Sequence, residues 1–373
     1  MLILVANLGS TSFKYRLLDM RDETTLAIGS VDRIGSVDEN EPASRCVSKI
    51  GDVEHIHEQR VADHGVAVQA CLAQLTDPDN GVIDTPSAVS AIGFKAVHGG
   101  RLSGVFVIDD DVLDAMQEMS AAAPAHNPPY IAAIKGLRKR VGDIPLVAAF
   151  ETDFHRTIPV ARQTYAIPKS WTRELHIRRW GFHGASHRYI AQRTARLVNN
   201  PSARIVSCHL GGSSSLCAIR DGNSVATTMG MTPQTGLPQN NRVGDFDPFA
   251  LPLIMRHTGE DITKTLERLA NEGGLLGISG RSSDIRDIES AAADGDADCQ
   301  LALDVYVEEV RRHLGGMIVA LGGVDVISFT GGIGEHSVEV RARVCDGLGW
   351  FGIELDRALN AVSAPSSRRM RKT

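Results

Sequence analysis

A short pattern of strand, small polar turn and strand occurs twice in this chain, 202 residues apart, and it constrains the fold more than any other feature. In each copy an apolar run leads into a turn rich in glycine and serine, after which a second strand begins. Aligning Leu8 with Leu210 superimposes the two turns, and the same offset places Leu17 on Ile219. A pattern repeated about half a chain apart indicates two related domains, each of which opens with a β-hairpin.

The rest of the chain predicts helices and strands in alternation. Its length of 373 residues fits two domains, because a single hydrophobic core rarely serves more than about 250–300 residues. Helical apolar spacing covers residues 111–122, 187–197, 261–271 and 302–321, and strand-like runs cover 91–97, 144–150 and 326–330. This alternation predicts an α/β protein with mixed sheets.

The composition excludes several classes of function. Charged residues are 23% and hydrophobic residues 43% of the chain, which argues against extensive disorder. The net charge is −6 and aromatic residues are 5%, so we expect no nucleic-acid partner. No apolar run reaches the ~18 residues of a membrane span, and the apolar segment 1–6 lacks the basic region of a signal peptide. The six cysteines form no CxxC pair, so we expect reduced thiols and a cytoplasmic location. Without an apolar span or a basic excess, we expect no membrane partner.

Glycine and serine cluster in turns beside predicted strand ends, at 7–12, 209–214, 273–283 and 330–337. Turns without Cβ atoms let backbone N–H groups approach an anion closely, and serine hydroxyls add donors. One such turn is typical of an ordinary hairpin, whereas four of them favour a polyphosphate held between two domains. The last turn joins a strand to a predicted helix, a usual place for the phosphate or ribose of a nucleotide. The chain has no Walker A or GxGxxG motif, so a nucleotide would be bound by a different fold.

Three polar segments could supply catalytic groups: 150–155 with two carboxylates, 181–187 with two histidines, and 241–248 with an arginine and two aspartates. For any single histidine the alternative is a structural role. His183 and His187 are four residues apart, but no third ligand at suitable spacing accompanies them, which argues against zinc. No GxSxG elbow supports a hydrolase triad. Cations and carboxylates beside polyphosphate turns favour phosphoryl transfer, in which Mg²⁺ and cations neutralise the moving group.

Taken in order, these motifs resemble those of the acetate and propionate kinase family, within the sugar kinase–Hsc70–actin superfamily. The resemblance extends over nearly the whole chain and includes Asn-Leu-Gly-Ser-Thr-Ser at 7–12, His-Asn-Pro at 126–128, Arg-Val-Gly-Asp-Phe-Asp-Pro at 242–248 and Gly-Gly-Ile-Gly-Glu at 331–335. It implies an α/β fold of two duplicated ribonuclease-H-like domains with a nucleotide cleft between them, in agreement with the repeat. We place the N-terminal domain at residues 1–152, completed by 338–373, and the C-terminal nucleotide-binding domain at 153–337.

The resemblance further implies reversible transfer of the ATP γ-phosphoryl group to a short-chain carboxylate, which gives an acyl phosphate and ADP. The implied catalytic residues are Glu151, Arg242, His183 and Lys95, and the implied ligands of Mg²⁺ or Mn²⁺ are Asn7 and Glu335. The implied contacts of ATP are Lys14, Ser10, Ser12, His209, Gly211, Gly212, Asp284, Arg286, Gly331, Gly332, Ile333 and Gly334. The implied contacts of the acid are Lys95, Val97, Ala125, Phe182 and Pro233, and His126 would line the cleft.

Several positions depart from the family's pattern. The usual Asp of Phe-Asp-Thr is Glu151, and the usual Arg two residues before Val97 is Lys95. Because displacements of ~1 Å can cost ~100-fold in rate, the extra methylene of Glu151 matters, and Asp153 is the alternative carboxylate. Ala125 replaces a usual Leu, which removes bulk from the expected acid pocket, and Arg101 replaces a usual Glu.

Three interpretations follow, in order of preference. The first is an acetate or propionate kinase with a coadapted site. The second is a kinase for a larger or hydroxylated acid, in which Ala125 makes room while Lys95 and Arg101 contact a second polar group. The third is a catalytically weak regulatory nucleotide-binding protein. The resemblance also implies a homodimer.

Overall fold

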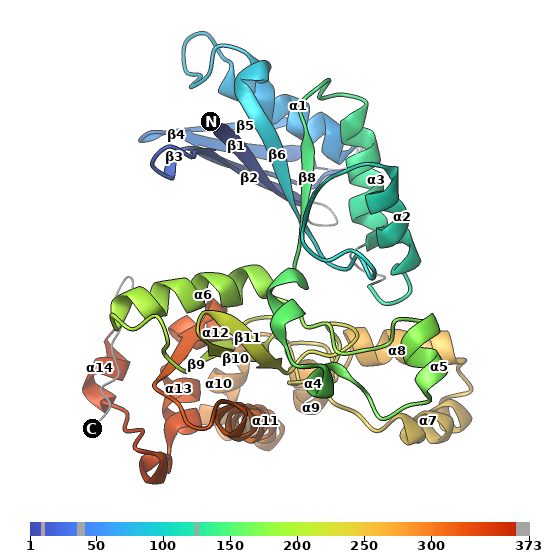
Figure 1. Ribbon diagram of the computed structural model, residues 1–373, viewed down its shortest axis with the longest axis vertical. Coiled ribbons are helices and arrows are strands. Elements are labelled where there is room, and N and C mark those ends of the chain that lie inside the picture. Colours follow the sequence, from blue (N-terminus) through green and yellow to red (C-terminus); the bar gives the residue numbers. More distant parts are fainter. Residues whose placement is uncertain (9–11, 36–41, 124–126, 363–373) are drawn as a thin grey trace. The chain divides into compact units, whose positions relative to one another are not determined.

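The computed structural model of this chain describes residues 1–8, 12–35, 42–123 and 127–362. The chain divides into two compact units, with the division between Asp153 and Phe154. Within the described ranges the first unit contains an eight-stranded sheet and the second a four-stranded sheet (Figure 1). The mixed α/β architecture predicted from the sequence is therefore confirmed.

The sheet of the first unit has the strand order β5-β4-β3-β2-β1-β6-β8-β7. Strands β1, β6 and β8 run parallel to one another, and the remaining neighbours are antiparallel. The carboxyl ends of β1, β6 and β8 consequently lie at one edge of the sheet. The strands are β1 Leu2–Leu8, β2 Ser12–Asp19, β3 Thr24–Asp32, β4 Ser44–Ile50, β5 Val53–Gln59, β6 Val89–Ala96, β7 Val105–Val107 and β8 Leu146–Phe150.

Alternation of side chains along the strands builds the core of this unit. In β2, Phe13, Tyr15 and Leu17 are buried, whereas the intervening Lys14 and Arg16 are exposed. Full burial of each such apolar side chain contributes about 1.5–3 kcal/mol. Three helices complete the core: α1 packs on β2 and β3, and α3 packs on both α1 and α2 (Figure 1). Their bounds are α1 His64–Leu75, α2 Asp110–Glu118 and α3 Asn127–Arg138.

The sheet of the second unit is buried on both faces. Its order is β11-β10-β9-β12, and β9 and β12 are parallel. Helix α11 packs on β10 and β11, while α6 packs on β9 and β12 (Figure 1). The strands are β9 Ile205–His209, β10 Ser215–Arg220, β11 Asn223–Thr227 and β12 Val326–Thr330. The helices are α4 Val160–Gln163, α5 Lys169–Glu174, α6 Gly184–Leu197, α7 Leu251–Thr258, α8 Ile262–Asn271, α9 Gly274–Ser279, α10 Ile285–Ala293, α11 Ala297–Leu321, α12 Gly331–His336, α13 Val338–Cys345 and α14 Arg357–Ala361.

The two units repeat one topology. The order β3-β2-β1-β6 in the first corresponds to β11-β10-β9-β12 in the second, with the same strand directions. The constant offset of 202 residues, however, holds only as far as the turn. Asn7 pairs with Lys14 and encloses six residues, whereas His209 pairs with Ser215 and encloses five. The second turn is one residue shorter, so Lys14 corresponds to Ser215 and Leu17 to Ala218 rather than Ile219.

Two other expectations differ from the structure. Residues 338–362, which the sequence analysis assigns to the first unit, pack in the second, because Val340 and Val344 on α13 are buried in its core beside α11. Arg341 ties α14 to α13 through hydrogen bonds to the side chain and carbonyl of Asn360. Two of the expected glycine turns are short helices, α9 and α12. In the described part of the chain no helix is long and apolar enough to span a membrane.

Candidate active site

The first unit gathers predicted site residues at the carboxyl ends of its parallel strands. Asn7 lies at the end of β1 and is the direct cross-strand partner of Lys14 on β2, and both side chains are exposed. Lys95 lies at the end of β6, and Glu151 follows β8 directly. Ligand sites in α/β sheets are typically found at this edge. The topology thus brings four of the predicted residues to one region.

Lys95 and Glu151 form an ion pair, with Lys95 Nζ 3.4 Å from Glu151 Oε1. The Glu151 side chain is 9% exposed and that of Lys95 42%, so the carboxylate is buried and the cation reaches solvent. The Glu151 N–H donates to the carbonyl of Ala96 at 2.8 Å, which fixes the end of β8 against β6. Val97, the next residue, is buried. This arrangement presents a partly exposed cation held by a buried carboxylate, which suits the binding of a small anion.

Arg101 does not extend toward this edge in the way the second interpretation requires. Its guanidinium pairs with Asp111 at 2.5 Å and with Glu118 at 3.6 Å, both on α2. These ion pairs raise the pKa of Arg101 and hold its side chain against the helix. Arg101 is therefore engaged in a surface ion pair.

In the second unit, two glycine turns meet because β9 and β12 are parallel neighbours. The Leu210 N–H donates to the Thr330 carbonyl at 2.8 Å, and the Gly334 N–H donates to the Leu210 carbonyl at 3.0 Å. Gly331 has φ +79°, and a Cβ there would lie 2.5 Å from the Leu210 carbonyl oxygen, so a larger residue is excluded. Ser214 closes the first turn by accepting from the Gly211 N–H at 3.2 Å.

A third loop carries Arg242 onto the first of these turns. The Asn240 N–H donates to the Gly212 carbonyl at 3.2 Å. Arg242 Nη1 lies 3.4 Å from Ser213 Oγ and 3.3 Å from Gln239 Oε1. Burial lowers the pKa of Arg242 from its ordinary value, but a guanidinium keeps its charge at neutral pH. The loop therefore holds a half-buried cation against a turn of small residues, an arrangement suited to a phosphoryl group.

Four histidines surround the same turn. The His183 ring stacks on that of His209 with centroids 4.2 Å apart, and His187 lies 6.3 Å from each. His183 adopts a left-handed backbone, φ +57°, at the N-cap of α6, a strained conformation for a residue with a Cβ. Burial lowers the pKa of His155 to about 4 and that of His187 well below its ordinary value, so both are neutral at pH 7.

The remaining predicted residues are spread over the start of α10, α12 and two loops. Asp284 caps α10 by accepting from the Arg286 N–H and also pairs with the Arg286 guanidinium at 2.6 Å, which lowers its pKa to about 2. Glu335 on α12 accepts from Thr330 Oγ1 at 3.3 Å. Phe182 and Pro233 are buried. Ser10, Ala125 and His126 lie outside the described residues.

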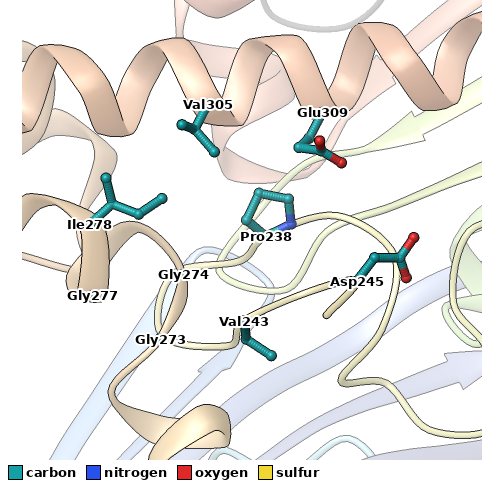
Figure 2. Close-up of a pocket in the computed structure, with 9 residues that line it drawn as sticks. All are labelled: Pro238, Val243, Asp245, Gly273, Gly274, Gly277, Ile278, Val305 and Glu309. Carbon is teal, nitrogen blue, oxygen red and sulfur yellow. The ribbon is translucent and has the colours of Figure 1, made fainter. Parts of the chain in front are cut away.

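A pocket of about 380 Å³ lies beside the loop that carries Arg242 (Figure 2). Its walls come from that loop, through Pro238 and Val243, from α9 and from α11. None of the predicted site residues lines it, so it is distinct from the arginine and histidine arrangement above. Within the described ranges no group of three or more acidic, histidine or cysteine side chains could hold a metal ion.

Comparison with known proteins decides the family. The family model described as the acetokinase family matches residues 2–370. This chain belongs to the acetokinase family. It is 39% identical to the acetate kinase of Pseudothermotoga lettingae over 99% of this chain and 92% of the relative. It is 41% identical to the acetate kinase of Treponema denticola over 97% of this chain and 91% of the relative.

Solved structures of the family also share this fold. The acetate kinase of Porphyromonas gingivalis superimposes with a TM-score of 0.85 at 34% identity, covering 96% of this chain and 90% of the other. A propionate kinase from Francisella tularensis gives a TM-score of 0.87 at 30% identity, covering 96% and 91%. The fold of this acetokinase-family chain is thus the one that the sequence resemblance implied.

Sequence reasoning missed several residues that support the site of this acetokinase-family chain. Ser215 and Ser207 hydrogen-bond to the histidines, and Gln239 contacts Arg242. His187 was noted for its spacing but given no role. The position of Ser215 directly after the glycine turn at 209–214 was a signal in the sequence. Its hydrogen bond to His183, however, depends on a strand register that the sequence does not specify.

Proposed function

We propose that this chain is an acetate kinase, which reversibly transfers the γ-phosphoryl group of ATP to acetate and forms acetyl phosphate and ADP. The observation that carries the proposal is the half-buried Arg242, which contacts Ser213 on the glycine turn at 211–214. Ser215, directly after this turn, hydrogen-bonds to His183. The names of the relatives support the same activity. Since acetate is already ionised at neutral pH, the reaction needs no general base. Catalysis therefore depends on positioning and charge stabilisation.

In this proposal one carboxylate oxygen of acetate attacks the γ-phosphorus while the bond from that phosphorus to the β–γ bridging oxygen breaks, and ADP retains the electron pair. Lys95, held by Glu151, attracts the acid, and Val97 contacts its methyl group. Arg242 and His183 stabilise the negative charge on the transferring group. Lys14 and the turns at 211–214 and 331–334 bind the phosphates and the nucleoside.

In this proposal Asn7 and Glu335 would hold Mg²⁺. Asn7 and Glu335 offer oxygen atoms, and Mg²⁺ commonly binds through one or two protein oxygens, several waters and the phosphates of its substrate. When bound, Mg²⁺ neutralises charge on the phosphate oxygens.

A kinase for a larger or hydroxylated acid is the second candidate. Its support came from Ala125, Lys95 and Arg101. The ion pairs of Arg101 with Asp111 and Glu118 weaken it, because a second polar group of the acid would have to displace them. A kinase for propionate is compatible with the same proposal, in which Val97 contacts the alkyl group of the acid.

A hydroxamate trapping assay tests the proposal. The purified protein is incubated with ATP, Mg²⁺ and acetate, propionate, butyrate, glycolate or lactate, and acyl phosphate is trapped with hydroxylamine. We expect product with acetate, less with propionate, and none without Mg²⁺. Preference for a hydroxylated or longer acid would favour the second candidate. Tight ATP binding without any product would instead support a regulatory nucleotide-binding protein.

We also propose that the protein is a cytoplasmic homodimer. All six cysteines are unpaired and buried, which suits a reducing compartment. Large apolar side chains are exposed on α7, α8 and the turn before α7, including Phe249 at 85% and Leu253 at 65%. Such a face typically marks an interaction site, and a second copy is the occupant we propose. Size-exclusion chromatography with light scattering should give twice 40.1 kDa, and Leu253→Asp should give the monomer. A monomeric parent protein would refute this.

A further inference from the structure

A continuous chain of hydrogen bonds ends on His183. Ser207 Oγ lies 2.9 Å from His187 Nδ1, His187 Nε2 lies 2.9 Å from Ser215 Oγ, and Ser215 Oγ lies 2.8 Å from His183 Nδ1. Ser207, His187 and Ser215 are all fully buried. We call these four residues the serine–histidine chain.

Two arrangements of hydrogens satisfy the chain in principle, because each hydroxyl and each neutral imidazole donates one hydrogen bond. In the outward arrangement Ser207 donates to His187, His187 donates to Ser215, and Ser215 donates to Nδ1 of His183. In the inward arrangement every donor is reversed, and the hydrogen on Nδ1 of His183 points to Ser215. The two arrangements leave His183 in opposite tautomers.

The position of Ser207 selects between them. The Ser207 hydroxyl has His187 Nδ1 as its hydrogen-bond partner. Among the described residues, the Ser207 hydroxyl has no second acceptor to which it could donate. In the inward arrangement the Ser207 hydrogen would be buried without a partner, which typically costs about 1–3 kcal/mol. Burial also keeps His187 neutral, which prevents it from donating at both nitrogens. The outward arrangement satisfies every group.

We propose that Ser207, His187 and Ser215 are positioning residues that fix His183 as the Nε2–H tautomer, so that its second nitrogen donates a hydrogen bond in the active site. A neutral ring in this tautomer donates to a phosphoryl oxygen without bringing a proton that the reaction does not use. The stacked His209 ring restrains the rotation of His183, and Ser186 Oγ, 2.8 Å from His209 Nδ1, holds His209 in turn. The effect on catalysis rests on the role of His183 proposed above.

A second buried serine–histidine pair in the same unit provides a matched control. His155 is also buried, and its Nδ1 lies 2.9 Å from Ser224 Oγ while its Nε2 donates to the Phe182 carbonyl at 2.9 Å. Ser224→Ala therefore deletes a buried serine–histidine hydrogen bond in the same unit, as Ser215→Ala does. The other hydrogen-bond partners of Ser224 are Cys217 and Thr157. The His155 ring meets that of His187 edge-on at 5.8 Å, but its two nitrogens hydrogen-bond to Ser224 and Phe182 rather than to the serine–histidine chain.

The first test is the ¹⁵N NMR spectrum of the imidazole nitrogens, which distinguishes a protonated from an unprotonated nitrogen. The His183 signals are assigned by their loss in His183→Asn. In the parent protein we expect Nε2 protonated and Nδ1 unprotonated. The reverse tautomer would overturn the proposal, whatever the enzymatic activity.

Variants then test transmission along the chain. Ser207→Ala, which does not contact His183, should shift the His183 nitrogen signals toward a mixture of tautomers, whereas Ser224→Ala should leave them unchanged. We expect kcat to fall about 10- to 100-fold in Ser215→Ala and about 3- to 10-fold in Ser207→Ala, with KM for ATP changed less than about threefold. Unchanged His183 signals in Ser207→Ala, or an equal loss of kcat in Ser224→Ala, would overturn the proposal. If the parent protein forms no acyl phosphate, the tautomer measurements still decide the structural claim.

Discussion

The ion pair of Lys95 and Glu151 predicts that two departures from the family compensate for each other. Relative to the family's usual Arg and Asp, the cation here is on a shorter side chain and the carboxylate on a longer one. The two changes act in opposite directions along the line between β6 and β8, and the groups still meet at 3.4 Å. We therefore expect each single reversion, Lys95→Arg or Glu151→Asp, to be harmful and the double reversion to restore activity.

The magnitude follows from the displacement. Each reversion moves a charged group by about one bond length, ~1.5 Å, and misplacement by ~1 Å can cost ~100-fold in rate. Because the Lys95 side chain is 42% exposed, it can shift and reduce part of this misplacement. We therefore expect each single variant to lose about tenfold in kcat/KM. If the double variant stays within about threefold of the parent, the coupling free energy is at least about 2 kcal/mol.

The assay is hydroxamate formation with acetate and saturating ATP for the parent, both single variants and the double variant. Exchanges at the exposed pair Arg138 and Asp110, 2.7 Å apart in the same unit, provide the control. Arg138→Lys and Asp110→Glu should change kcat/KM less than twofold, that is by about 0.4 kcal/mol or less. Additive losses in the double variant, about 100-fold in total, would refute the compensation. Full activity in either single variant would show that the position of this pair is not critical.

Three further predictions concern single groups. Arg242→Ala should lower kcat by about 10³-fold or more, and an unchanged kcat would remove it from catalysis. The folded protein holds His155 at a pKa of about 4 against 6.5 for the unfolded chain, so the unfolded state binds more protons as the pH falls. The free energy of unfolding should therefore decrease by about 3 kcal/mol between pH 7 and pH 4 on account of this group, a slope that urea titrations should find reduced in His155→Gln. Burial raises the pKa of the thiols of Cys71, Cys208 and Cys217. Native protein should consequently react with a thiol reagent only as fast as it unfolds, and a rapid stoichiometric reaction would contradict this.

Much of the fold follows from local sequence patterns. The strand predicted at 326–330 is β12 at those residues, and both hairpins form where the glycine turns indicate. The strands from 44 to 59 were not predicted. In β5 the side chains of Val53 and Ile56 are exposed, so the alternation that identifies a half-buried strand is missing. β5 pairs with β4 through a short turn, and β4 in turn pairs with β3.

The site was less predictable than the fold. Motifs identified Arg242, His183 and Lys95, since the resemblance covers those positions. The hydrogen bond from Ser215 to His183 depends on the register of β9 against β10. A turn shorter by one residue changes which side chain of β10 faces His183. The helical content of 331–336 was also missed, because Gly-Gly-Ile-Gly has low helix propensity and the segment is held by Leu210 from the neighbouring turn.

The shorter second turn has a consequence for how the two halves diverged. By register, Asn7 and Lys14 occupy the same backbone positions in the first hairpin as His209 and Ser215 in the second. One copy carries an amide and a cation on an exposed face, and the other carries an imidazole and a fully buried hydroxyl. A lysine at 215 would be a buried charge. Equivalent positions of the two hairpins therefore carry different polar groups, one pair facing solvent and the other supporting a buried network of hydrogen bonds.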